Sequence, residues 1–184
     1  TIFELIDEAA TDASIKRLEI ESLGAGHESD KQLLHVEAEE ALENVKLVGD
    51  VVIASFFNET IKTKRKQLLS KYAGKISEWS DEKSSKEALE EIANALSNGS
   101  RPIPAFHWEI EFPEVFAREN GGFDAFVGNP PFLGGMRISS TNSQEYRDWL
   151  YQSFPDSGNR MDLVAYFFRQ AFAQLRHTGC FGLV

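Results

Sequence analysis

Hydrophobic residues recur every three or four positions through the first hundred residues, and this period predicts helices. The stretches around Ile6–Ala13 and from Ile61 to Trp79 each show it. Ser84, with Glu87 three positions on, resembles a capping box that opens a further helix. The longest run lies between Ser29 and Phe57, and its predicted inward stripe is Leu34, Ala38, Ala41, Val45, Val48, Val52 and Phe56. A helical hairpin or bundle follows for residues 1–100.

The hydrophobic period changes to two near residue 106. Aromatic and aliphatic residues alternate with polar ones from Phe106 to Phe112, which predicts a strand. Pro113 suits the first turn of a short helix at 114–119. The apolar, weakly charged segment Phe123–Gly128 predicts a short strand of a parallel sheet.

Two helices and a closing strand are expected after this segment. Asn142 and Glu145 are placed to cap the first helix. The second is predicted from Met161 to His177, with the inward residues Val164, Phe167, Phe168, Ala171, Phe172 and Leu175. Gly179 is expected to end it before the last strand. Strand, helices and strand form a crossover unit, so residues 101–184 predict an α/β fold with part of a doubly wound, Rossmann-like sheet.

Composition narrows the functional classes. The 184 residues include one cysteine, Cys180, and four scattered histidines, so neither a disulfide framework nor a metal site is predicted. No apolar run reaches the length of a membrane span and no signal peptide is visible, which favours a cytoplasmic protein. The net charge of −10 argues against strong DNA binding by this chain alone.

The segment Asn129-Pro130-Pro131-Phe132 directly follows the predicted strand and carries the candidate chemistry. Ligands of parallel sheets bind at the carboxyl ends of the strands. An exocyclic amine is a poor nucleophile, so a site that alkylates it must accept hydrogen bonds from both N–H groups. The Asn129 side chain and the carbonyl of Pro130 can supply two acceptors. Phe132 offers a flat face on which a base can stack.

These four residues resemble the Asn/Asp/Ser-Pro-Pro-Tyr/Phe motif of amino-methyltransferases, in which asparagine comes first in most adenine-N6 enzymes. Residues 107–132 and 47–57 are also similar to segments of large bacterial restriction-modification and phage-exclusion methylases. The resemblance implies S-adenosylmethionine as cofactor and transfer to a flipped-out adenine N6, with DNA bound through the full-length protein. Asn129, Pro130, Pro131 and Phe132 would form the catalytic pocket. Phe132 departs from the commoner tyrosine.

The glycine-rich cofactor turn of such enzymes is not convincingly present. The only candidate is Gly24 and Gly26, which we reject because a helical pattern precedes them and a long helix follows. Glycines that end a helix explain them better. The resemblance places the cofactor strand before Thr1, so the chain is interpreted as an internal piece, expected neither to bind the cofactor tightly nor to methylate by itself.

Other functions remain open on the sequence. The same motif occurs in enzymes that methylate guanine-N2 of ribosomal RNA or a glutamine of release factors, and a non-enzymatic helical interaction module is a third possibility. Four further features are interpreted as structural, not as catalytic or ligand-binding. Asp50 and the cluster Lys62–Lys66 are expected on solvated helix faces. Asp162 is read as a carboxylate at a helix start, and Cys180 as a buried strand residue.

Overall fold

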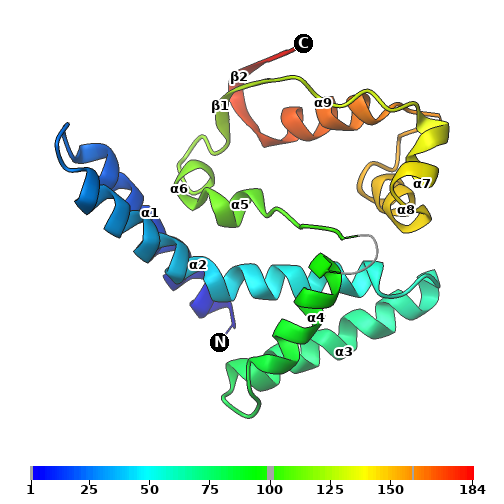
Figure 1. The fold of residues 1–184 in the computed structure, drawn as a ribbon, viewed down its shortest axis with the longest axis horizontal. Helices are drawn as coiled ribbons and strands as arrows, with labels where there is room; N and C mark the ends of the chain where they lie inside the picture. Colours follow the sequence, from blue (N-terminus) through cyan, green and yellow to red (C-terminus); the bar gives the residue numbers. More distant parts are fainter. Residues whose placement is uncertain (1, 99–101, 159) are drawn as a thin grey trace. The chain divides into compact units, whose positions relative to one another are not determined.

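The structure is a computed structural model that describes residues 2–98, 102–158 and 160–184 (Figure 1). The chain divides into two compact units, Thr1–Arg118 and Glu119–Val184. The boundary predicted between residues 100 and 101 falls within 99–101, which lie outside the described residues.

The first unit is helical. Its long helices are α1 (Ile2–Ser22), α2 (Glu28–Phe57), α3 (Lys62–Ser80) and α4 (Glu87–Asn98), and two single turns follow, α5 (Trp108–Glu111) and α6 (Pro113–Phe116). Helices α1 and α2 lie side by side as a hairpin (Figure 1). The predicted helical bundle is therefore confirmed for this part of the chain. Helix α4 begins at Glu87, later than the predicted capping box, and Ser85 rather than Ser84 hydrogen-bonds the Glu87 carboxylate.

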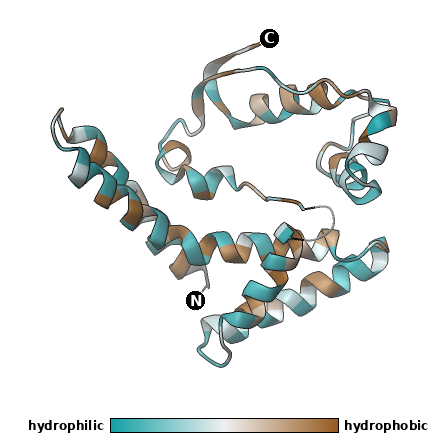
Figure 2. Ribbon diagram, viewed as in Figure 1, coloured by the Kyte–Doolittle hydropathy of each residue, from teal (hydrophilic) through white to brown (hydrophobic). Residues whose placement is uncertain are grey.

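Two apolar clusters hold the first unit together. Ala13 of α1 is fully buried against Ala38 and Leu42 of α2, and the small alanines let the two helices approach closely. The larger cluster joins the second half of α2 to α3 and α4, with Val51, Tyr72 and Leu89 among its members. Figure 2 shows hydrophobic and hydrophilic residues mixed along the helices, as expected for helices that keep part of their surface in contact with solvent.

The inward stripe predicted for α2 is partly wrong. Ala38, Val45 and Phe56 are buried as predicted, but Val52 is 43% exposed. Leu42, Leu47, Val51 and Ala54 are buried instead. Helix α2 contacts α1, α3, α4 and α5, so it buries more than one face and no single stripe describes it.

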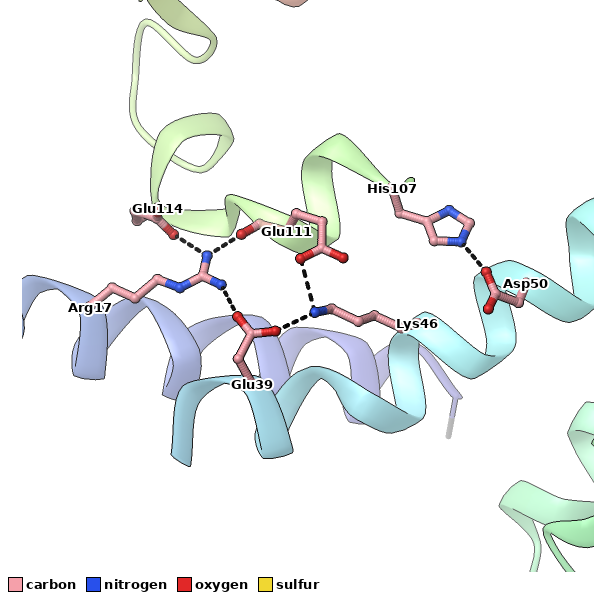
Figure 3. A network of polar contacts seen from close by, with 7 residues as sticks. All are labelled: Arg17, Glu39, Lys46, Asp50, His107, Glu111 and Glu114. Carbon is pink, nitrogen blue, oxygen red and sulfur yellow. Dashed lines mark hydrogen bonds and ion pairs between the residues drawn. The ribbon is translucent and has the colours of Figure 1, made fainter. Parts of the chain in front are cut away.

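The strand predicted from Phe106 to Phe112 is also wrong, because the backbone forms the helical turn α5 (Trp108–Glu111) there. The amides of Ile110 and Glu111 both donate to the carbonyl of His107. A helical turn places His107 and Glu111 on the same side, four residues apart, and both side chains reach α2 (Figure 3). Two of the three polar residues of the alternation, His107 and Glu111, therefore face the protein, whereas Glu109 is exposed.

A network of charged groups joins α5 and α6 to the α1–α2 hairpin (Figure 3). The Arg17 guanidinium contacts Glu39 at 2.9 Å and Glu114 at 3.1 Å, and it also donates to the carbonyl of Glu111. Lys46 contacts Glu39 at 2.6 Å and the Glu111 carboxylate at 2.9 Å. Charged groups alternate in sign along the network, so each carboxylate meets a cation.

The network changes the proton affinities of its members. Burial alone raises the pKa of Glu39, but the hydrogen bonds and charges of Lys46 and Arg17 outweigh burial and hold that pKa below its ordinary value. Burial alone lowers the pKa of Lys46, but Glu39 and Glu111 outweigh it and raise that pKa. Both groups are therefore charged in the folded protein at neutral pH.

Asp50 does not lie on a solvated face, as the sequence had predicted. Its carboxylate lies 2.8 Å from Nε2 of His107 (Figure 3), and the two side chains are only 27% and 16% exposed. The His107 ring lies directly over Gly49, where a β-carbon would stand 2.7 Å from Cε1 of the imidazole. Glycine at this position is what lets the ring reach Asp50.

The basic cluster at the start of α3 is likewise not uniform. Lys62, Lys64 and Lys66 are exposed as predicted, whereas Arg65 is buried. The Arg65 guanidinium carbon lies 3.8 Å from the centre of the Phe56 ring, and Nε donates to the carbonyl of Glu59. Arg65 therefore joins α3 to the end of α2 through a cation–π contact.

The second unit contains two parallel strands, β1 (Phe123–Gly128) and β2 (Leu175–Leu183). The segments between them form the single 3₁₀ turn η1 (Gly135–Arg137) and the helices α7 (Ile138–Thr141), α8 (Gln144–Ser153) and α9 (Leu163–Gln174). Parallel pairing across intervening helices is the predicted crossover. The described chain is thus mostly helical with a two-stranded parallel sheet.

Helices α7, α8 and α9 share one core in the second unit. Its buried members are Ile138, Leu150, Leu163 and Tyr166. The inward face predicted for α9 is partly wrong. Ala171 is buried as predicted and Val164 and Leu175 are partly buried, but Phe167, Phe168 and Phe172 are exposed, while Leu163 and Tyr166 are buried. Helix α9 is also shorter than predicted, since β2 begins at Leu175, before Gly179. Cys180 is exposed in β2, contrary to the prediction of a buried residue.

Candidate functional site

The segment Asn129–Phe132 leaves the carboxyl end of β1. The strand pairing runs to the last residue of β1, with Gly128 opposite Leu183. One more ladder bond follows, from the amide of Val184 to the carbonyl of Gly128 at 3.0 Å. Asn129 is therefore the first residue past a fixed strand end, where ligands of parallel sheets bind.

The four candidate residues differ in exposure. Pro130 is buried, whereas Asn129 and Pro131 are exposed and Phe132 is 72% exposed. Within the described part of the chain, the Asn129 side chain has no hydrogen-bond partner. Pro130 has a fixed φ, so it stiffens the segment. It covers neither the Asn129 amide nor the Phe132 ring. The Asn129 amide and the Phe132 ring are thus both accessible.

The chain is fixed again directly after Phe132. The Leu133 amide donates to Oδ1 of Asp162 at 3.1 Å, and its carbonyl accepts from the amide of Leu163 at 3.0 Å. The Leu133 side chain packs against the core of α7, α8 and α9. Gly135 is buried so tightly that a β-carbon would stand 2.5 Å from the carbonyl oxygen of Met161. The candidate loop is therefore anchored at both ends.

The chemistry of the loop follows from these groups. An amide oxygen and a backbone carbonyl accept hydrogen bonds, and neither changes charge between acidic and alkaline pH. An exposed phenyl ring can stack on a planar base. The arrangement suits recognition of an N–H-bearing aromatic substrate and contains no ionisable side chain within Asn129–Phe132.

Residues 6–184 match the family described as Eco57I restriction-modification methylase. The chain belongs to that family. The match spans both units. The family's pattern therefore includes the helical first unit in addition to the second unit, which holds the loop. No curated protein and no solved structure matches the chain.

Membership in this family implies methyl transfer with S-adenosylmethionine, and it suggests DNA as the partner. The pair Gly24 and Gly26 does not fit a glycine-rich cofactor turn, because such a turn follows a strand. Here the pair lies between α1 and α2, with Gly26 at a φ of +96°. The glycines end one helix before the next begins, as predicted. We assign no residue of this chain to the cofactor.

Among residues 2–98, 102–158 and 160–184, no group of three or more His, Cys, Asp or Glu side chains is placed to hold a metal ion. No helix in the same ranges is long and apolar enough to span a bilayer.

Sequence reasoning interpreted Asp162 only as a carboxylate at a helix start. The structure confirms the cap, since Oδ1 accepts from the Val164 amide at 3.0 Å. The second bond, from the Leu133 amide, was missed. A similar cap opens α8, where the structure uses Ser143 instead of the predicted Asn142: its Oγ accepts from the Tyr146 amide at 3.0 Å.

Proposed function

We propose that the protein containing this chain methylates the N6 amine of adenine in DNA, as the modification activity of a restriction-modification system. One observation carries the proposal: an Asn-Pro-Pro-Phe segment with an accessible asparagine and an accessible ring stands at the end of β1, in a member of a restriction-modification methylase family. The family favours DNA over ribosomal RNA or a release factor as the substrate.

Asn129 and Pro130 have the central role in this proposal. The Asn129 side-chain oxygen and the Pro130 carbonyl accept one hydrogen bond each from the adenine amine. Two acceptors favour the tetrahedral nitrogen, whose lone pair is then available for attack. Such bonds strengthen as the nitrogen gains positive charge, so they stabilise the transition state more than the bound substrate.

Phe132 would hold the base that has left the duplex. An adenine out of its helix loses stacking, and an exposed aromatic ring next to the amine acceptors replaces part of it. Stacking of this kind contributes about 1–3 kcal/mol per base. The methyl donor S-adenosylmethionine carries an electrophilic methyl group on its own sulfonium, so no ionised base is required of the loop.

We also propose that β1 and β2 are two neighbouring strands of a larger doubly wound sheet. Their parallel pairing across the helices α7–α9 supports this. The high exposure of Val127 in β1, 87%, fits a strand face that further elements cover.

Mass spectrometry of nucleosides tests the function. DNA from cells that express the full-length protein is compared with DNA from cells that express Asn129→Ala. We expect N6-methyladenine with the wild type and a loss of about 100-fold or more in methylation rate with Asn129→Ala, since one transition-state acceptor is removed. Asn94→Ala, a change of an exposed asparagine on α4, is the matched control and should leave the rate unchanged.

Phe132 supplies a second test. Phe132→Ala should lower the rate about tenfold to a hundredfold through lost stacking, while Phe132→Tyr keeps the ring and the activity. The ring is largely exposed, so neither change should alter the melting temperature. Full activity of Asn129→Ala, or methylation confined to ribosomal RNA or a release factor, contradicts the proposal.

A further inference from the structure

We propose that Asp162 is a positioning residue for methyl transfer, because it ties the end of the Asn129–Phe132 loop to the start of α9. The inference rests on the proposed function and deepens it. Asp162 touches neither Asn129 nor the ring of Phe132 in the described contacts, so its effect passes through the backbone.

One carboxylate oxygen of Asp162 serves two backbone amides. Oδ1 accepts from Val164 at 3.0 Å, which caps α9, and from Leu133 at 3.1 Å, which holds the residue that follows Phe132. The side chain is half-buried and comes from a position 29 residues after Leu133. Bonds from amides to a charged carboxylate are about twice as strong as those between neutral groups.

Two neighbouring contacts make the attachment stiff. The Leu163 amide donates to the Leu133 carbonyl at 3.0 Å, so Leu133 is bonded to the start of α9 through both its amide and its carbonyl. Gly135 packs its backbone against that of Met161, where a β-carbon has no room. The segment from Leu133 to Gly135 is thus held rigidly against the start of α9.

The other end of the loop is fixed by the sheet, through the bond from Val184 to Gly128. Only four residues lie between the two anchors, Asn129 to Phe132, and two of them are prolines. A short, stiff span held at both ends fixes where the Asn129 oxygen and the Phe132 ring point. Loss of the Asp162 bond leaves Leu133 hydrogen-bonded to the Leu163 amide alone and loosens that span, and displacements of about 1 Å in a reacting group can cost about 100-fold in rate.

The test compares three variants of the full-length protein. Asp162→Ala removes both bonds, and we expect kcat for DNA methylation to fall about tenfold to a hundredfold. Asp162→Asn keeps an oxygen that can accept from both amides, so it should restore most of the rate. Ser143→Ala is the matched control, because it removes the cap of α8 without touching the loop.

Hydrogen exchange gives a readout that does not depend on activity. The amide of Leu133 should exchange faster in Asp162→Ala, and remain as protected as in the wild type in Asp162→Asn and Ser143→Ala. We expect Asp162→Ala to lose more kcat than Ser143→Ala, although both variants lose a comparable amount of thermal stability. That pattern together with the faster exchange of Leu133 supports the positioning role.

The outcomes separate the two proposals. If the wild type methylates adenine in DNA but Asp162→Ala retains the kcat of Ser143→Ala, the positioning role is overturned and the proposed function stands. Unchanged exchange of Leu133 in Asp162→Ala overturns it as well. If the wild-type protein methylates no DNA, the proposed function fails, and the role of Asp162 in it falls with it.

Discussion

Replacement of Gly49 by alanine tests whether the His107–Asp50 contact fixes the α5 turn on α2. Glycine inside a helix is less favourable than alanine by about 0.8–1.0 kcal/mol, so Gly→Ala in an open helical site should stabilise the fold by about that amount. Gly74 of α3 is such a site, because no atom beyond its chain neighbours and its own helix backbone lies within 4 Å of the β-carbon it lacks. Gly49 is not.

At Gly49 the new β-carbon would stand 2.7 Å from Cε1 and 2.8 Å from Nε2 of the His107 ring. The ring must move, and it then gives up its bond of 2.8 Å to Asp50. Loss of a bond that involves a charged partner costs about 1.5–3 kcal/mol, before any discount for partial exposure. The lost bond outweighs or cancels the gain in helix propensity. We therefore expect Gly49→Ala to leave the free energy of unfolding unchanged or to lower it by about 2 kcal/mol.

Denaturation by urea at pH 7 measures the difference. Two of the three tryptophans, Trp79 and Trp108, lie in the first unit with both glycines, so most of the fluorescence change follows the unfolding of that unit. Gly74→Ala should raise the free energy of unfolding by about 1 kcal/mol, while Gly49→Ala should not raise it. In a His107→Ala background the ring is absent, and Gly49→Ala should then stabilise like Gly74→Ala. Equal stabilisation by both glycine changes in the wild-type background would refute the reasoning.

Three further changes probe the first unit, each measured as a free energy of unfolding by denaturation. Arg17→Lys removes the fork that contacts Glu39 and the α6 turn, and should cost about 1–2 kcal/mol; no change would mean that the network is not formed. The pKa of Glu39 is lowered in the folded state, so its stabilising effect is complete above the ordinary pKa of 4.5 and is lost as the pH falls through the folded pKa. In Glu39→Gln the free energy of unfolding should therefore fall less steeply as the pH drops below about pH 4. The difference should be about 1 kcal/mol or less, because the side chain is partly exposed, and an unchanged dependence of stability on pH contradicts this. Leu42→Ala should cost about 2–5 kcal/mol because Leu42 is fully buried, whereas Leu33→Ala, at 59% exposure on the same helix, should stay within about 0.5 kcal/mol; similar losses from both would contradict the packing.

The helices of the first unit could be predicted because a period of three to four is a local property. The faces that they bury could not be predicted as well. Val52 lies on the predicted stripe of α2 yet is 43% exposed, while Val51 beside it is fully buried. The buried face depends on where α3 and α4 pack, and their positions are not encoded in the period of α2 itself.

The segment from Phe106 to Phe112 shows how a period can mislead. Its alternation of aromatic and polar residues satisfies the pattern of a strand. The same sequence also places His107 and Glu111 four residues apart, and both find charged partners on α2, at Asp50 and Lys46. These partners lie more than fifty residues earlier, so the contact that favours the helical turn is invisible to a local pattern.

The candidate loop combines what is local with what is not. The identity of its acceptors is written in four consecutive residues, and its place after a strand follows from the apolar run of Phe123–Gly128. An aspartate before an apolar helix likewise predicts the cap that Asp162 forms with the amide of Val164. That the same oxygen also binds Leu133 depends on the return of the chain after α7 and α8. A sequence motif can therefore specify which groups meet the substrate, whereas their orientation depends on a tertiary contact that joins the loop to a helix start, and the rate of a reaction is sensitive to that orientation.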